Sequence, residues 1–320
     1  LSGWDRTHIE GALLGLCSDH FLDLGQGLIQ VSRVFDLLEC SRASPSQAAQ
    51  VLAGLGLQLA QAERWEAQPE WLPLRQRLDS LDLAALHRAS IKGAPAWFDR
   101  SGLLRALVEM GPEHCFAVWL KAIQGGVPLP DLAEILALGA TERLLRADLR
   151  ADFDPGVSQG WMELAQALTH AQALQDVVSR WHDARVVRLL LFGVWRVAEL
   201  CALDGEPTGL EEPKMGDVPA LLHAAALRDP VRALAIGRQL TLPALRDAVM
   251  HLGLDGQTAL PLQSAHRTHA ALAALRLSEE LPDDQARLPL LGVLRYLSAP
   301  RQERRLMKDL SEAWAWGQGE

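Results

Sequence analysis

Two carboxylates and an imidazole stand close together near the N-terminus, at Asp19, His20 and Asp23, in an otherwise apolar stretch that continues to Gln26. Burying such groups costs several kcal/mol unless they are paired, hydrogen-bonded or bound to a metal. A carboxylate beside an imidazole is also the unit that orients a histidine to ligate a metal or to act as a base. We therefore take Asp19, His20, Asp23 and Gln26 as the candidate functional site.

The same segment has a structural interpretation that requires no chemistry. Asp19 is a suitable N-cap for a helix that begins here and carries His20 and Asp23 in its first turns. In such a helix the carboxylate of Asp23 would satisfy the imidazole of His20. Gln26 does not titrate and is a poor metal ligand, so the structural interpretation is the one we favour.

Two further histidines, His170 and His223, each stand within apolar helical sequence. Together with His20 they could form a metal site in the core of a helical bundle, where facing helices contribute one or two ligands each. Each could equally be a hydrogen-bonded histidine at the edge of the core. His266 and His269 share one helix face, but no acidic residue accompanies them at helical spacing, and we interpret them as part of a polar surface strip.

The common sequence signatures of catalysis are missing from this chain. It has no GxGxxG motif after a strand, no Walker A lysine, no GxSxG and no HExxH. It also lacks ExxH, the motif of helical di-iron proteins. We therefore expect neither an enzyme nor a cofactor, and iron would be the metal if the histidine site is retained.

Composition and charge exclude several classes of protein. The 320 residues carry a net charge of −9 with a pI of about 5.6, whereas a surface that binds nucleic acid is basic. No uncharged apolar run reaches the length of a transmembrane helix. The four cysteines are scattered and form no CxxC pair, which is typical of reduced thiols in the cytoplasm. We expect a cytoplasmic protein that binds neither nucleic acid nor membrane.

The spacing of apolar residues predicts helices along the whole chain. Apolar residues recur at intervals of three and four, as at Leu132, Ile135 and Leu136. Short connections between helices favour antiparallel neighbours. We therefore predict an all-α fold, a multi-helix bundle of antiparallel helical hairpins. Its helix starts are marked at Ser44-Pro45, Gly111-Pro112, Asp229-Pro230 and Thr241-Leu242-Pro243, and its helix ends at Gly125-Gly126 and Gly253.

A long irregular stretch over residues 204–217, with two prolines and three glycines, divides the predicted helices into two blocks. We expect an N-terminal block over residues 1–203 and a C-terminal block over residues 218–320, which form either two domains or one continuous domain. Residues 218–254 resemble HEAT-like helical hairpins, although the chain as a whole shows no regular period.

The segment from Asp19 to Leu28 resembles the opening motif D-H-[FY]-L-D-x-G-H-A-L of a bacterial family of helical proteins. In that family the helical region often precedes a Rieske iron–sulfur domain. The family is similar to questin-oxidase-like proteins, which are regarded as histidine-rich metal oxygenases. The motif is matched by Asp19, His20, Phe21, Leu22, Asp23, Gly25 and Leu28, whereas Gln26 replaces its second histidine.

Three weaker matches extend the resemblance over most of the chain. Residues 159–167 resemble the family motif H-H-x-F-T-Y-A-N-A and residues 259–263 resemble F-H-x-[FY]-Q, but neither stretch keeps the histidines. Residues 294–299 resemble the closing helix of the family, and the chain has no cysteine–histidine pairs of a Rieske domain. The resemblance thus implies the family fold with most of its histidine site lost, and metal affinity depends on the number of ligands.

Three functions remain open from the sequence. The first is a non-catalytic helical protein that acts as the partner subunit of an active relative or as a scaffold that binds a protein or a small molecule, with a symmetric homo-oligomer as the default state. The second is a divergent iron-dependent oxygenase that uses His20, Asp23, His170 and His223. The third is a HEAT-like interaction solenoid.

Overall fold

The computed structural model describes residues 6–21, 25–62, 64–93, 95, 97–149, 160–205, 216–255 and 261–300. Over these residues the chain forms fifteen α-helices and no β-strand, which confirms the predicted all-α bundle. The helices are α1 (Arg6–Asp19), α2 (Gln26–Ser41), α3 (Pro45–Ala60), α4 (Leu72–Asp79), α5 (Leu83–Ser90), α6 (Arg100–Glu109), α7 (Pro112–Gln124), α8 (Leu129–Arg146), α9 (Trp161–Arg180), α10 (Arg185–Glu199), α11 (Val218–Ala226), α12 (Pro230–Gly237), α13 (Leu242–Leu254), α14 (Pro261–Glu280) and α15 (Leu288–Ser298), with the 3₁₀ helices η1 (Trp65–Ala67) and η3 (Leu200–Leu203).

Local sequence signals set most of the helix boundaries. Ser44 caps α3 in a capping box with Gln47, and Pro45 is the first helical residue. Asp229 and Thr241 cap α12 and α13 through their side-chain oxygens. These starts confirm the predicted ones. Helix α13 ends at Leu254, one residue after the predicted end at Gly253. The glycine is not left-handed, however, and an added Cβ would overlap the Cβ of Ala271 on α14, so it allows close helix packing.

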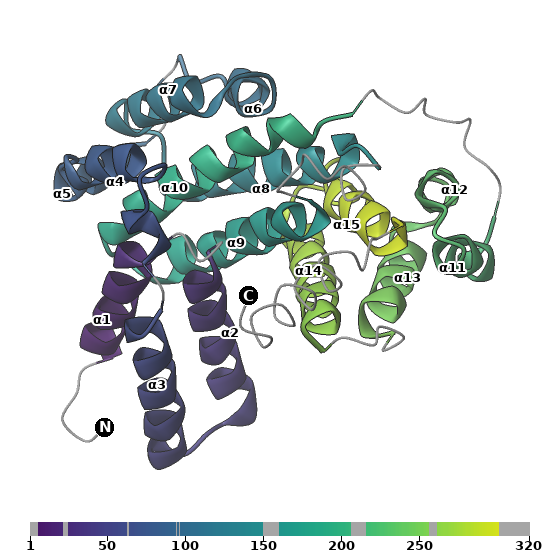
Figure 1. Cartoon of the computed structure of the whole chain (residues 1–320), viewed down its shortest axis with the longest axis horizontal. Helices are drawn as coiled ribbons and strands as arrows, with labels where there is room; N and C mark the ends of the chain where they lie inside the picture. Colours follow the sequence, from purple (N-terminus) through teal and green to yellow (C-terminus); the bar gives the residue numbers. More distant parts are fainter. Residues whose placement is uncertain are drawn as a thin grey trace, which may run out of the picture.

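Helix α9 is the centre of the bundle, and sixteen of its twenty residues are buried. It contacts α8, α10, α2 and α14, while α15 packs on α8. Figure 1 shows α1 to α3 at one end of this centre and α11 to α15 at the other. Buried apolar residues from Leu13 to Ala299 belong to one continuous core. Helices on either side of residues 204–217 therefore share a core, and residues 206–215 of that stretch lie outside the described part of the chain.

Arginine side chains close the C-terminal ends of seven helices. The last four carbonyl groups of an α-helix have no partner within it, and a cation there also interacts favourably with the helix dipole. The fully buried Arg143 donates from Nη2 to the carbonyl of Leu107 in α6 and from Nε to that of Val197 in α10, both at 3.0 Å. The other pairs are Arg295 with Leu144 and Leu145 of α8, Arg287 with Gly237 of α12, Arg267 with Leu252 of α13, Arg246 with Ser278 of α14, and Arg228 with Leu297 of α15.

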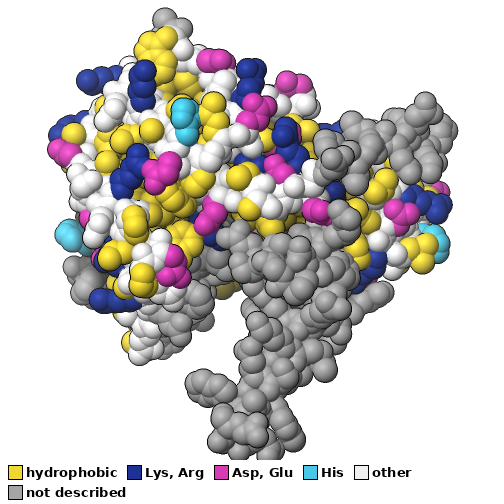
Figure 2. Space-filling view, turned by 45° about the horizontal axis from the view of Figure 1, so that its top comes forward, with side chains coloured by type: hydrophobic (Ala, Val, Ile, Leu, Met, Phe, Trp, Pro, Cys, Tyr) yellow, Lys and Arg dark blue, Asp and Glu magenta, His cyan; other side chains and the backbone are white. Residues whose placement is uncertain are grey.

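On the face of the molecule shown in Figure 2, basic and acidic side chains are interspersed and do not gather into one patch of either sign. Among the described residues, none of the helices combines the length and the apolarity that crossing a lipid bilayer requires.

Candidate functional site

The segment around His20 connects two helices. Asp19 is the last residue of α1, and α2 begins only at Gln26, after Gly25, whose φ of 75° is left-handed. The prediction that Asp19 caps a helix beginning there is therefore wrong. The apolar positions upstream, such as Leu13, Leu14 and Cys17, are buried and extend the preceding helix up to this point. Asp23 lies outside the described residues.

His20 is paired with a buried carboxylate that lies 46 residues further along the chain. Its Nδ1 is 3.1 Å from Oε1 of Glu66, whose side chain in η1 is fully buried. Arg75 on α4 reaches the same oxygen at 3.3 Å. No hydrogen-bond partner is present for the other oxygen, Oε2, in the described part of the chain. The sequence analysis missed Glu66, because only the fold brings η1 to the end of α1.

Further charges of alternating sign surround this pair. Arg188 on α10 lies 2.6 Å from Asp79 and 3.9 Å from the largely exposed carboxylate of Asp19. Asp79 in turn lies 3.6 Å from Arg75. The guanidinium of Arg188 also sits 5.4 Å from the ring centroid of Phe21. We call this set the α1–α10 cluster; its members are Asp19, His20, Glu66, Arg75, Asp79 and Arg188.

His170 lies inside the bundle on α9. Its Nε2 is 3.4 Å from the carbonyl oxygen of Leu189, and its ring meets the edge of Phe192 with the ring centroids 5.6 Å apart. A Cβ at Gly25 would overlap its Nδ1, so the backbone at the start of α2 packs directly on the imidazole. Nδ1 makes no well-formed hydrogen bond with the described residues, although the Gly25 backbone favours the protonated ring. Burial dominates and lowers the pKa of His170 to about 4, so the ring is neutral near neutral pH.

A small hollow opens between α9 and α10 beside His170. It leaves about 10 Å³ for the centre of a water-sized sphere, which is about the room that one water molecule needs. Gln166 lines it with a buried side-chain oxygen that has no partner in the described residues. The surface of the hollow is mostly apolar with a few polar atoms, and the hollow is too small for an organic substrate. It is lined by Glu163, Gln166, Ala167, His170, Phe192, Gly193, Arg196 and Val197.

The three histidines of the predicted metal set lie in different surroundings. His20 is at the end of α1, His170 is inside the bundle, and His223 is exposed on α11, which contacts α12, α13 and α15. Gln26 is half-buried at the start of α2. Within the described ranges, no group of three or more His, Cys, Asp or Glu side chains is arranged to hold a metal ion.

His266 and His269 are half-buried on α14, so the predicted surface strip is only partly exposed. Burial lowers the pKa of both rings. The charge of Glu163 acts in the opposite direction on His266, whereas Arg33 lowers the pKa of His269 further. Helix α14 packs on α9, a contact that the local sequence pattern does not reveal.

A second charged cluster joins α2, α9 and α14, and the sequence analysis missed it as well. Asp176 on α9 accepts from Ser32 on α2 at 2.8 Å and from Arg276 on α14 at 3.0 Å. Arg276 also reaches Asp36 on α2 at 2.7 Å. These residues are separated by up to 244 positions in sequence, so only the packing of the three helices places them together.

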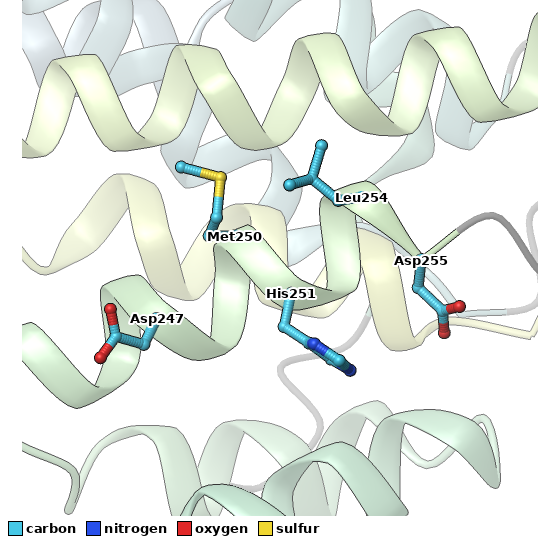
Figure 3. Close-up of a pocket in the computed structure, with 5 residues that line it drawn as sticks. All are labelled: Asp247, Met250, His251, Leu254 and Asp255. Carbon is cyan, nitrogen blue, oxygen red and sulfur yellow. The ribbon is translucent and has the colours of Figure 1, made fainter.

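The side chains that line a surface depression on α13 do not point toward a common site. It is lined by Asp247, Met250, His251, Leu254 and Asp255. Figure 3 shows these side chains projecting in different directions from the helix, with Met250 and Leu254 on one side and His251 on the other.

Comparison with protein-family models, with curated proteins and with solved structures finds no match for this chain.

Proposed function

We propose that this chain is a helical scaffold that works by binding other polypeptide chains, as a partner subunit, without chemistry of its own. The observation that carries the proposal is helix α3. Its sixteen residues include no Asp, Glu, Lys or Arg, although charged residues make up 22% of the chain. A surface helix normally carries charged residues on its outer face.

Most of α3 faces solvent. Only Leu55 and Leu59 are buried, while Leu57 and Val51 are 60% and 38% exposed. Figure 1 shows α3 beside α2 at the outer edge of the bundle. These exposed apolar side chains alternate with uncharged polar ones such as Gln50 and Gln58. A lack of charged residues is typical of the centre of protein-interaction sites.

The contacts that the candidate polar residues make support the same proposal. In the α1–α10 cluster, His20 and Glu66 connect the end of α1 to η1, and Arg188 connects α10 to α4. The ring of His170 is packed between α2, α9 and α10. These contacts hold helices together, which is the work expected of polar groups in a scaffold.

The second candidate is the divergent metal-dependent oxygenase. One observation favours it: the His20–Glu66 pair has the geometry with which a carboxylate orients a metal-ligating imidazole. In that case His20 would be a ligand, and Glu66 would act through it as a positioning residue.

Elemental analysis of protein purified without chelator separates the two functions. The scaffold predicts no stoichiometric metal and a melting temperature that chelation leaves unchanged. Iron near one equivalent that disappears in His20→Ala and stays in His223→Ala would overturn the scaffold and support the oxygenase. Far-UV circular dichroism of both variants shows whether they are folded.

A further inference from the structure

We infer that the adjoining ends of α5 and α7 form a docking site for a short acidic segment of a partner protein, which supplies carboxylates and an apolar side chain. The inference rests on the proposed scaffold function and adds a second surface to it, distinct from α3. We call this surface the α5–α7 patch; its members are Arg88, Ile91, Lys92, Trp97 and Lys121.

A pair of glycines at the end of α7 shapes the patch. Helix α7 ends at Gln124, and Gly125 and Gly126 follow it. A Cβ at Gly125 would overlap the ring of Trp97, so this ring lies directly on the backbone of Gly125. At Gly126, whose φ of 100° is left-handed, an added Cβ would lie 3.6 Å from the Cβ of Lys92. Trp97 and Lys92 therefore lie beside each other across the two glycines, where α5 contacts α7.

The apolar part of the patch is exposed to solvent. Ile91, which directly follows α5, is 71% exposed, and Trp97 is 57% exposed. Tryptophan is among the residue types that are most enriched at the energetic centres of interfaces. Because the ring of Trp97 already lies on Gly125, it loses little conformational freedom when a partner packs on it. Trp97 is thus suited to anchor an apolar side chain of the partner.

The polar part of the patch is basic. Arg88 and Lys121 lie in the last turns of α5 and α7, and Lys92 follows Arg88 by four residues. All three side chains are exposed, and none of them forms an ion pair with the part of the chain that the structure describes. Basic residues suit the ends of helices because of the helix dipole, and this position leaves their charged groups in water. The nearby carboxylate of Asp99 is turned toward Gly102 at the start of α6, so the charges of the patch itself are all positive.

Charge favours a short acidic segment over other occupants. The whole chain carries a net charge of −9, so a large anionic surface, such as a membrane or a nucleic acid, would be repelled by acidic groups around the patch. Exposed charges are largely screened beyond about 10 Å at 0.1 M salt. A short segment can stay within this distance of the three cations and still place an apolar side chain on Trp97 and Ile91. A neutral or basic segment would gain nothing from the cations.

The size of the patch sets the expected affinity. Two exposed apolar side chains and three cations make a small contact, and exposed ion pairs contribute little each. We expect a dissociation constant of about 10 to 100 μM at low salt. Binding should weaken at least about tenfold when NaCl is raised from about 0.05 to about 0.5 M, because salt screens exposed charges.

Fluorescence anisotropy with the full chain and a labelled synthetic peptide tests the inference. The probe is a short peptide that repeats Glu-Glu-Leu, and a peptide of equal length that repeats Gln-Gln-Leu should bind at least about tenfold more weakly. Trp97→Ala and Lys92→Glu should each weaken binding of the acidic peptide at least about fivefold. Leu227→Ala and Arg232→Glu make matched changes at exposed positions and should leave binding unchanged. These control positions lie at α11 and α12, on the opposite side of the bundle from α5 (Figure 1).

The inference is overturned by an acidic peptide that does not bind up to about 500 μM, or by a neutral peptide that binds equally well. Binding that either folded variant leaves unchanged overturns it too, and far-UV circular dichroism shows which variants are folded. Lys92 lies in a turn outside α5, so Lys92→Glu decides the matter if Trp97→Ala does not fold.

Vesicles that contain phosphatidylserine separate a membrane from a polypeptide partner. Binding of the vesicles without binding of the acidic peptide would overturn the inference and make the patch a membrane contact. A chain that binds neither the peptide nor a metal removes this site but leaves the scaffold and α3 standing, whereas stoichiometric iron removes the scaffold itself.

Discussion

Replacing His170 with glutamine should remove a large part of the pH dependence of stability. Burial lowers the pKa of this imidazole from 6.5 to about 4 in the folded chain. Between these values the unfolded chain binds a proton that the folded chain does not, so stability is complete above pH 6.5 and decreases as the pH falls. The lost free energy of unfolding is about 2 kcal/mol at pH 5 and at most about 3 kcal/mol near pH 4.

Urea unfolding followed by tryptophan fluorescence at pH 7 and pH 5 measures this contribution. Wild type should lose about 2 kcal/mol more than His170→Gln between the two values, since glutamine does not titrate. Groups common to both proteins, such as His266 and His269, cancel in the comparison. His223→Gln, at an exposed position on α11, is the matched control and should follow the wild-type curve. Parallel curves for wild type and His170→Gln would refute the argument that burial keeps this ring neutral.

Two further predictions concern the backbone and the helix ends. Gly25→Ala should lower the free energy of unfolding by about 2 to 4 kcal/mol, because φ is 75° and the new Cβ overlaps His170. Gly54→Ala in α3, where the new Cβ meets open space, should instead raise the free energy of unfolding by up to about 1 kcal/mol. Urea unfolding that changed the stability of both variants in the same direction would contradict this account. Arg143→Met leaves the carbonyl ends of α6 and α10 and the carboxylate of Asp204 without their donor, and should cost about 3 to 5 kcal/mol. Arg105→Met, on the exposed side of α6, is the control, and its free energy of unfolding should stay within about 0.5 kcal/mol of wild type in the same experiment. A loss below about 1 kcal/mol for Arg143→Met would show that the contacts of Arg143 are replaceable.

The helices could be predicted from the sequence because their signals are local. A capping residue such as Ser44 or Asp229 acts on backbone groups three residues away, and apolar spacing acts over one or two turns. The N-cap prediction at Asp19 was wrong for a reason that is also local in sequence. A good capping residue also occurs at the end of a helix when the apolar face upstream, here with Leu13 and Cys17, is already buried.

The sequence by itself determined the all-helical fold and most helix starts, among them the one at Pro45. Only the tertiary structure decided that Glu66 is the partner of His20, that His170 and His223 lie in different surroundings, and that most residues of α3 are exposed. Capping residues and apolar spacing determine helices because they act on residues that are close in sequence. Pairing, burial and exposure depend on which distant helices share a core, and that is settled by the packing of the whole chain.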